Sequence, residues 1–346
     1  MRITNITGKN LQRYGRIVVC CLFFVTAKAQ DPHFSQYFAS PMTMNPALTG
    51  KQVTDWRALA LFRSQWWSGT ETAPFTTTSF SLEKGFATGK NGKNSLGIGL
   101  SLLSDASNAG LLKNNFFTLG AAYNLGLDAN GDEQIGLGIQ TSYASRLVDV
   151  SKLELQSQFG SMGFQRTYSG DPINALSNHY WDVNLGIHYS KDFIPQHWGL
   201  RLGAALYHAG TPTAGVFTNT VYTVESRYSF QGGVVVRRPA GEFDLSMITD
   251  IQGTNTICTV GGVYKLKVQS DVLESFHLGI WNRINDSFYP YIAMQGHNWL
   301  VGISYDILKP SSRAAFSSVQ SMEFSLAWHF GSAGKRPAQF PKMVTY

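Results

Sequence analysis

Apolar residues alternate with small or polar residues along many stretches of this chain. In residues 96–102 the sequence LGIGLSL places leucine or isoleucine at every second position, and residues 135–140 repeat the pattern as IGLGIQ. The segments 299–307 and 322–330 alternate in the same way. Because successive side chains of a β-strand point to opposite faces, this pattern predicts strands with one apolar face and one polar or small face.

The alternation predicts fourteen strands between residues 55 and 330. Most are about ten or more residues long, which suits tilted strands that cross a bilayer. The predicted strands are 55–68, 72–84, 94–105, 109–127, 133–146, 177–191, 197–209, 223–237, 242–250, 255–267, 274–284, 288–295, 298–307 and 319–330.

A soluble β-sandwich also alternates, so periodicity alone does not decide the fold class. Aromatic residues near segment ends favour a membrane barrel, whose strands carry aromatic girdles at both interfaces. These aromatics are Trp66, Trp67, Tyr180, Trp181, Trp198, Tyr289 and Tyr291. Since lipid does not tolerate an open sheet edge, the strands are expected to close into an all-β, antiparallel outer-membrane β-barrel.

The connections between the predicted strands alternate in length. An even strand count places both termini of the chain on the periplasmic side. The periplasmic connections are then short, at 128–132, 238–241 and 296–297. The extracellular set includes the long stretches 147–176, 210–222 and 308–318.

Residues 1–29 have the order of a secretory signal peptide. A basic stretch precedes a short apolar run at 17–26, and Ala27 and Ala29 supply an A-x-A pattern, with cleavage predicted before Gln30. A membrane anchor is the alternative, but a spanning helix needs about 20 apolar residues and this run has about half as many. The chain is therefore expected in the outer membrane, exported through a cleaved signal peptide.

The signal segment contains five basic residues and no acidic one, so the predicted mature chain is close to neutral despite the +6 charge of the whole sequence. No clustered basic run remains that would suit nucleic acid. Cys20 and Cys21 lie in the apolar run, and Cys258 alone remains, so no intramolecular disulfide is expected. Cys258 is expected to be a small apolar residue, buried or facing lipid.

Residues 30–54 lack alternation and are expected to lie in the periplasm or to plug the inner mouth of a barrel spanning 55–330. Asp-Pro and Asn-Pro pairs at 31–32 and 45–46 restrict the local backbone, because proline fixes its own φ and limits the preceding residue. Phe34, Tyr37 and Phe38 supply an apolar cluster. This segment either contacts a partner or packs into the barrel mouth. Residues 331–346 form a polar tail.

The opening of the predicted mature chain resembles that of the PorP/SprF family, which begins with a D-P-x-F-S-Q block, a proline and N-P-A-x-x-G. The positions that carry the resemblance are Asp31, Pro32, Phe34, Ser35, Gln36, Pro41, Asn45, Pro46, Ala47 and Gly50. The sequences FRSQW at 62–66, PFTT at 74–77, YDI at 305–307 and SMEFSL at 321–326 also match family patterns. The loop 147–176 and the long tail depart from them.

The resemblance implies a non-enzymatic outer-membrane component of the type IX secretion and gliding machinery. Family members support secretion or surface attachment of large adhesins, and some associate with periplasmic ring proteins. The implied partners are type IX ring proteins or a large secreted adhesin, besides outer-membrane lipid, and the ten motif positions are candidate docking residues. The alternative is a channel for small hydrophobic solutes that is similar to fatty-acid transporters, some of which have fourteen strands.

Four residues on the polar face of their strands are candidates for a polar network in the lumen. Arg63 has Glu323 or Asp306 as a possible ion-pair partner, and Gln65 lies on the same face as Arg63. Charges solvated separately in a wet lumen are an equally good interpretation.

No sequence pattern indicates a catalytic, cofactor or metal site. The histidines lack H-E-x-x-H or paired-cysteine spacing, and no phosphate loop is present. Ser325 with His329 or His277 is the one arrangement that suggests a hydrolase, but no nucleophile motif surrounds Ser325. The glycines inside strands are expected to make room for crowded lumen side chains or for barrel curvature.

Overall fold

The computed structural model describes residues 31–51, 56–67, 74–89, 93–161, 163–165, 176–214, 222–268, 270, 272–309 and 320–330. The predicted signal peptide and C-terminal tail lie outside the described residues. Residues from Pro32 onward form one compact unit.

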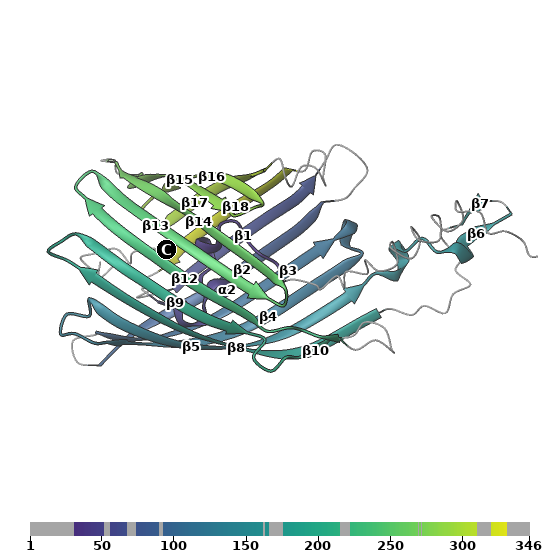
Figure 1. The fold of residues 1–346 in the computed structure, drawn as a ribbon, viewed down its shortest axis with the longest axis horizontal. Coiled ribbons are helices and arrows are strands. Elements are labelled where there is room, and N and C mark those ends of the chain that lie inside the picture. Colours follow the sequence, from purple (N-terminus) through teal and green to yellow (C-terminus); the bar gives the residue numbers. More distant parts are fainter. Residues whose placement is uncertain are drawn as a thin grey trace, which may run out of the picture. The chain divides into compact units, whose positions relative to one another are not determined.

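Fourteen antiparallel strands in the described part of the chain form one closed barrel, and β1 pairs with β18 to close it (Figure 1). These strands are β1 (Trp56–Trp67), β2 (Phe75–Thr88), β3 (Asn94–Ser107), β4 (Leu112–Gly126), β5 (Glu133–Val148), β8 (Leu176–Phe193), β9 (Trp198–Tyr207), β12 (Arg227–Arg238), β13 (Gly241–Gln252), β14 (Asn255–Lys267), β15 (Ser275–Arg283), β16 (Ser287–Gln295), β17 (Trp299–Leu308) and β18 (Gln320–Phe330). The predicted fold class and strand number are confirmed, and the predicted bounds differ by at most four residues.

The described residues also form short elements that are not part of the barrel wall. They are η1 (Tyr37–Ala39), α2 (Pro41–Met44), η2 (Pro46–Leu48), η4 (Asn108–Gly110), η5 (Val150–Lys152), η6 (Gln156–Gln158), and the hairpins β6 (Phe159–Gly160) with β7 (Gly163–Phe164) and β10 (Thr213–Ala214) with β11 (Tyr222–Thr223). Within the described residues, no helix has the length and apolar character needed to span a membrane.

Strands β4 and β12 begin three and four residues later than the alternation predicts. Ala109 (φ 55°) and Gly110 (φ 80°) adopt left-handed backbone conformations, so they form a turn and β4 starts at Leu112. Thr223 pairs with Thr213 in the β10–β11 hairpin, so the wall strand β12 starts at Arg227. In both cases local turn geometry interrupts a segment whose composition still alternates.

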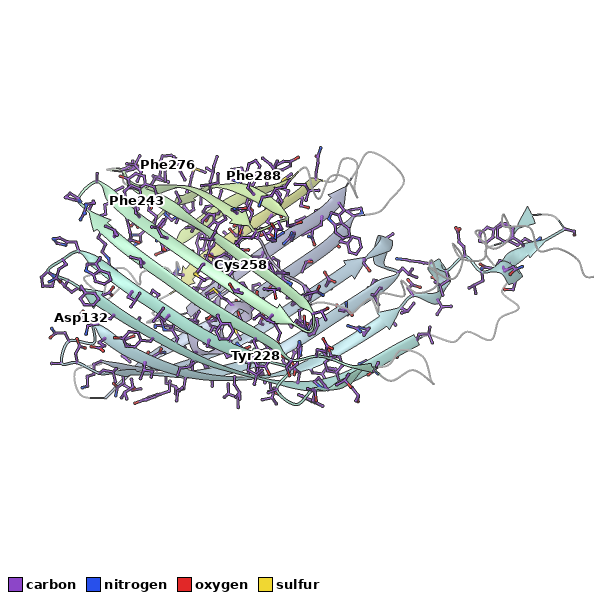
Figure 2. The ribbon with its side chains drawn as sticks, in the orientation of Figure 1. Asp132, Tyr228, Phe243, Cys258, Phe276 and Phe288 are labelled. Carbon is purple, nitrogen blue, oxygen red and sulfur yellow. The ribbon has the colours of Figure 1, made fainter. Side chains whose placement is uncertain are left out.

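The two faces of the wall differ as the alternation predicts. Large apolar side chains cover the outer face (Figure 2), and Leu137 and Ile280 expose 61% and 60% of their surface there. The inner face carries buried small or polar side chains such as Ser79, Ser81 and Ser142. An apolar exterior around a polar interior is the arrangement of a membrane barrel.

The expectation that Tyr289 and Tyr291 form part of an interfacial girdle is wrong. Both side chains are buried on the inner face, at 0% and 3% exposure, while the alternate residues Phe288 and Ile292 face outward. Tyr180 likewise points inward, whereas its neighbour Trp181 is 67% exposed. Strand β16 is apolar on both faces, so its composition does not show which face meets lipid.

Candidate functional site: the plugged lumen

Residues 32–51, here called the plug, lie inside the barrel as three short helical turns (Figure 1). Proline opens both α2 and η2, where its fixed φ and missing N–H suit a first helical residue. The side chain of Asn45 accepts a hydrogen bond of 2.9 Å from the Ala47 N–H and so caps η2. Of the two predicted locations for this segment, the structure shows the lumen.

The plug crosses the lumen from one end to the other. Ser35 contacts Arg283, which adjoins the β15–β16 turn at 284–286. Lys51 contacts Ser190, close to the β8–β9 turn at 194–197 at the opposite barrel end. In the orientation predicted from the connection lengths, Ser35 lies nearer the extracellular end and Lys51 nearer the periplasmic end.

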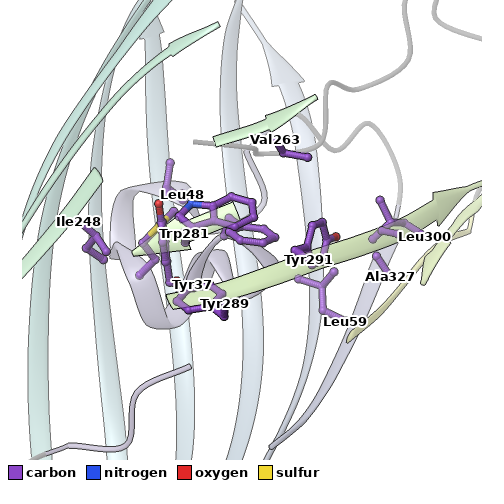
Figure 3. Packing of buried hydrophobic residues seen from close by; sticks show 13 residues of the cluster. Tyr37, Leu48, Leu59, Ile248, Val263, Trp281, Tyr289, Tyr291, Leu300 and Ala327 are labelled. Carbon is purple, nitrogen blue, oxygen red and sulfur yellow. The ribbon is translucent and has the colours of Figure 1, made fainter. Parts of the chain in front are cut away.

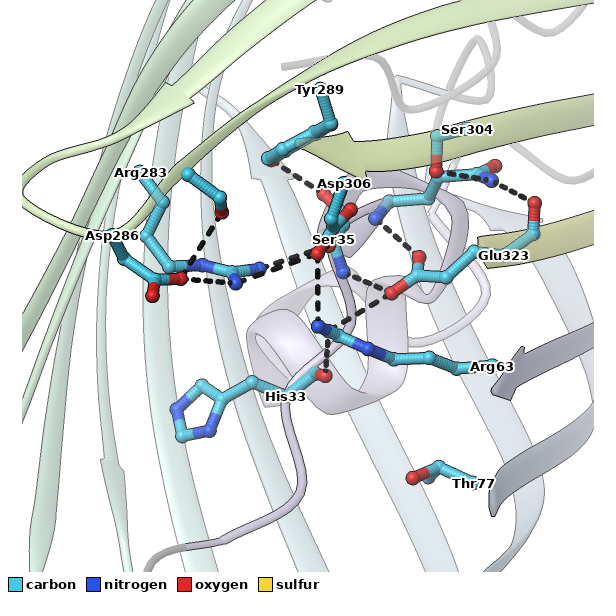
Figure 4. Close-up of polar contacts among 12 residues, drawn as sticks. His33, Ser35, Arg63, Thr77, Arg283, Asp286, Tyr289, Ser304, Asp306 and Glu323 are labelled. Carbon is cyan, nitrogen blue, oxygen red and sulfur yellow. Dashed lines mark hydrogen bonds and ion pairs between the residues drawn. The ribbon is translucent and has the colours of Figure 1, made fainter. Parts of the chain in front are cut away.

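An ion-pair cluster holds the first part of the plug (Figure 4). The Arg63 guanidinium lies 3.1 Å from Asp306 Oδ2 and 3.0 Å from Glu323 Oε1, and all three side chains are buried. Arg63 Nη1 also donates to the carbonyl of His33. With its carboxamide oxygen toward the guanidinium, Gln65 accepts from Arg63 Nη2 at 2.7 Å. The structure thus brings the four predicted lumen residues together.

The plug supplies hydrogen bonds that buried carboxylates require. The backbone N–H groups of Ser35 and Gln36 both donate to the Glu323 carboxylate, the second at 2.7 Å. Ser35 Oγ donates to Asp306 Oδ2 at 2.7 Å. Removing one member of such a buried cluster typically costs about 3–5 kcal/mol, so the plug and the wall stabilise each other.

Ser35 and Gln36 contact β15 and β16 as well as β17 and β18. Arg283 Nη2 donates to Ser35 Oγ at 2.9 Å, and the Tyr289 hydroxyl donates to the Ser35 carbonyl at 2.7 Å. Gln36 Nε2 donates to Ser304 Oγ at 3.1 Å. Two consecutive plug residues therefore connect the last four strands of the barrel.

The second part of the plug is held by amide side chains from the opposite wall. Asn45 Nδ2 donates to the Ile187 carbonyl at 3.0 Å and to Gln231 Oε1 at 2.9 Å. Gln231 Nε2 donates to the Met44 carbonyl, and Gln140 Nε2 to the Met42 carbonyl, both at 3.0 Å. These bonds satisfy plug backbone carbonyls that the short helical turns leave open.

Glycines in the wall give the plug backbone its space. A Cβ added to Gly97 would overlap the Thr49 carbonyl, and one added to Gly138 would overlap the peptide between Pro46 and Ala47. Other strand glycines make room for lumen side chains, as the sequence predicts: a Cβ at Gly136 would overlap Asn124, and one at Gly203 would overlap Gln231.

Aromatic side chains of the plug and of the wall pack together in one apolar cluster (Figure 3). Phe38 stacks on Trp281 with ring centroids 4.6 Å apart and meets Tyr291 edge-on at 5.1 Å. The Tyr37 hydroxyl lies 2.7 Å from Ser246 Oγ, so its polar end is satisfied. Offset and edge-on aromatic pairs contribute about 0.5–1.5 kcal/mol each beyond their area burial.

The ten motif positions are divided by burial. Asp31, which precedes the plug in sequence, and Pro32, its first residue, are partly exposed. The other eight are buried against the barrel wall: Phe34, Ser35, Gln36, Pro41, Asn45, Pro46, Ala47 and Gly50. In this state the buried positions are available only to the wall itself.

Several residues that hold the plug were not singled out from the sequence: Gln140, Gln231, Arg283 and Ser304. Each occupies the inward parity of its strand, which alternation does indicate. The alternation does not indicate that these side chains contact the plug.

Within the described residues, Ser325 forms no hydrogen bond with a histidine. Ser325 Oγ donates to Gln36 Oε1 at 2.6 Å, and His277 Nε2 lies 2.9 Å from Ser275 Oγ. No group of three or more potential metal ligands among His, Cys, Asp and Glu occurs in that part of the chain.

A recess of about 540 Å³, including its open side, lies between the plug and the wall. Its lining is mostly apolar, and Arg57, His277 and Ser325 are its polar residues. Arg57 also pairs with buried Glu83 at 2.9 Å. The lining residues are Phe38, Ala39, Pro41, Arg57, Leu59, Val263, His277, Tyr291, Leu300, Ser325, Leu326 and Ala327.

A sequence model of the family described as type IX secretion system membrane protein PorP/SprF matches residues 26–328. The chain belongs to the PorP/SprF family. This confirms the resemblance drawn from the motif block, and with the closed barrel it makes the protein an outer-membrane β-barrel of a type IX secretion family.

Solved barrels are similar to this PorP/SprF protein at low identity. The toluene transporter TodX of P. putida is 11% identical, over 83% of this chain and 93% of its own, with a TM-score of 0.42. A Pseudomonas aeruginosa FadL homologue is 11% identical, over 83% and 98%, with a TM-score of 0.44. BamA from Haemophilus ducreyi is 8% identical, over 80% and 70%, with a TM-score of 0.40. No curated protein sequence matches the chain.

Proposed function

We propose that this PorP/SprF protein is a non-enzymatic scaffold of the type IX secretion and gliding machinery. In this role it supports the secretion or surface attachment of a large adhesin and docks components of the machinery. The family match supports the type IX role. The choice of a scaffold over a conduit rests on the lumen.

The observation that carries this choice is the bonding of Ser35 and Gln36 to four wall strands. A segment that fills a lumen and completes its buried charge network is costly to displace. A barrel built in this way offers rigid outer surfaces to partners rather than an open path to solutes.

The contacts of Ser325 support the non-enzymatic role. A nucleophilic serine needs a base within hydrogen-bond reach. In the described residues the Ser325 hydroxyl instead donates to Gln36, which belongs to the plug. Hydrolysis of acyl esters that is lost in Ser325→Ala would contradict this part of the proposal.

Affinity purification tests the proposed function. The tagged protein is recovered from detergent-solubilised outer membranes, washed stringently, and the bound proteins are identified by mass spectrometry, with an equally tagged unrelated barrel as the control. Recovery of type IX ring components or one large adhesin is expected. Recovery of the barrel alone, together with solute flux in liposomes, would overturn the proposal.

A channel for small hydrophobic solutes is the second candidate, and the apolar recess beside Phe38 favours it. Its lining has the composition of small-molecule sites, with many apolar side chains and few polar ones. In liposomes, this candidate requires uptake of a hydrophobic solute that falls when Leu300→Trp fills the recess. Leu202→Trp, on the outer face and 46% exposed, is the matched control.

A further inference from the structure

On the outer face of the neighbouring strands β4, β5 and β8, a row of aromatic side chains is followed by a row of polar ones. Phe117, Tyr143 and Trp181 face outward with 43%, 38% and 67% exposure. The next outward residue on each strand toward the same barrel end is polar: Asn115, Ser145 and His179. Aromatic rows mark the interface between hydrocarbon and water in membrane barrels, so these strand ends extend beyond the hydrocarbon.

These strand ends belong to the same barrel end as the start of the plug. Arg63, near the end of β1, contacts His33 there, and the long connection after Val148 also leaves from this end. The predicted orientation places this end outside the cell. The periplasmic end, near Lys51, is separated from it by the plugged lumen.

The connection after β5 carries an exposed aromatic pair on the β6–β7 hairpin. Phe159 and Phe164 are cross-strand partners with ring centroids 5.2 Å apart, and they are 65% and 37% exposed. A Cβ at Gly160 or Gly163 would meet no atom within 4 Å. The hairpin therefore presents two rings to its surroundings with open space beside its turn.

We do not expect these rings to contact lipid hydrocarbon, because their hairpin follows strand ends that extend beyond the aromatic row of Phe117, Tyr143 and Trp181. Burying a phenylalanine that is otherwise in water is favourable. Aromatic side chains are enriched among the residues that dominate protein interfaces. The two rings thus have the chemistry of an anchor for an apolar pocket on another protein.

We propose that the Phe159–Phe164 pair docks the large surface adhesin, and that the adhesin offers an apolar pocket to the two rings. This inference rests on the proposed function, because it assigns a surface to the adhesin that the scaffold supports. The plugged lumen and the extracellular side of the hairpin separate this surface from ring proteins in the periplasm.

Two double variants test the surface. Phe159→Ser with Phe164→Ser removes the pair. Ile194→Ser with Val272→Ser removes two apolar side chains, 47% and 71% exposed, from turns at the opposite barrel end. Intact cells carrying each tagged variant are treated with a membrane-impermeant crosslinker, and the barrel is then purified. The adhesin is identified as a large bound protein that protease removes from intact cells. Equal heat-modifiable migration on gels shows that each variant folds.

The expected result is a loss of adhesin recovery of about tenfold or more with the hairpin variant, and unchanged recovery with the opposite-end variant. Loss only with the opposite-end variant, or with neither, overturns the assignment of the surface while the bound adhesin still supports the proposed function. Crosslinks between copies of the barrel that need Phe159 also overturn it. Failure of the unaltered protein to recover any type IX component or adhesin counts against the proposed function itself.

Discussion

The backbone N–H of Gln36 donates a hydrogen bond of 2.7 Å to Oε2 of Glu323, a residue 287 positions later in the chain. Glu323 lies on the last strand, and its carboxylate also pairs with Arg63 on the first. One carboxylate therefore joins the plug, the first strand and the last strand at the seam where the barrel closes.

Glu323→Gln is expected to destabilise the folded barrel by about 3–5 kcal/mol, because it removes one charge from a buried cluster and leaves Asp306 as the one carboxylate paired with Arg63 in that cluster. The midpoint of urea unfolding in detergent, followed by heat-modifiable migration, measures the effect. Glu274→Gln is the control: its carboxylate is partly exposed beside His297, and its loss is expected to cost less than about 1 kcal/mol. Equal shifts in the two variants would contradict the importance of the cluster.

Tyr289→Phe is expected to cost about 0.5–1.5 kcal/mol, because it removes the hydrogen bond to the Ser35 carbonyl and leaves the ring packing in place. The same unfolding measurement applies. Tyr123→Phe loses a hydroxyl that accepts from Asn94 on the exposed outer face, and little change is expected. A Tyr289→Phe barrel as stable as the unaltered one would show that this bond contributes nothing net.

Gly138→Val is expected to expel the plug or to block assembly, because the new side chain would occupy the space of the Pro46–Ala47 peptide. Conductance in planar bilayers distinguishes the two results: an assembled barrel without its plug conducts, and a failed one is absent from the membrane. Gly160→Val is the control, since a Cβ there meets no atom within 4 Å. Normal assembly with closed channels in Gly138→Val would mean that the plug lies elsewhere.

His33→Cys tests the direction of the plug, in a Cys258→Ser background that leaves the predicted mature chain without another thiol. His33 is partly exposed near the end assigned to the cell exterior. A membrane-impermeant maleimide added to intact cells is expected to label it, and to leave Val272→Cys, at the opposite end, unlabelled. The reverse pattern would invert the orientation, and with it the side assigned to Phe159 and Phe164.

The strands could be predicted because alternation reports a local property of each segment, the difference between its two faces. Tyr289 and Tyr291 were misplaced because β16 is apolar on both faces, and only the plug explains why its inner face carries tyrosines. For Arg63, the sequence alone allowed an ion pair with Glu323, an ion pair with Asp306, or separately solvated charges. Nothing local connects residues so far apart, and the closure of β1 on β18 brings them together.

The contacts of the plug also imply an order of steps in the assembly of the barrel. The plug residues precede every strand in the chain, yet Arg283, Tyr289, Asp306 and Glu323, which hydrogen-bond to Ser35 and Gln36, come from the last four strands. Until the last four strands have joined the barrel, the binding site for the plug is incomplete. Seating of the plug is then the last step of maturation, and a seated plug marks a finished molecule.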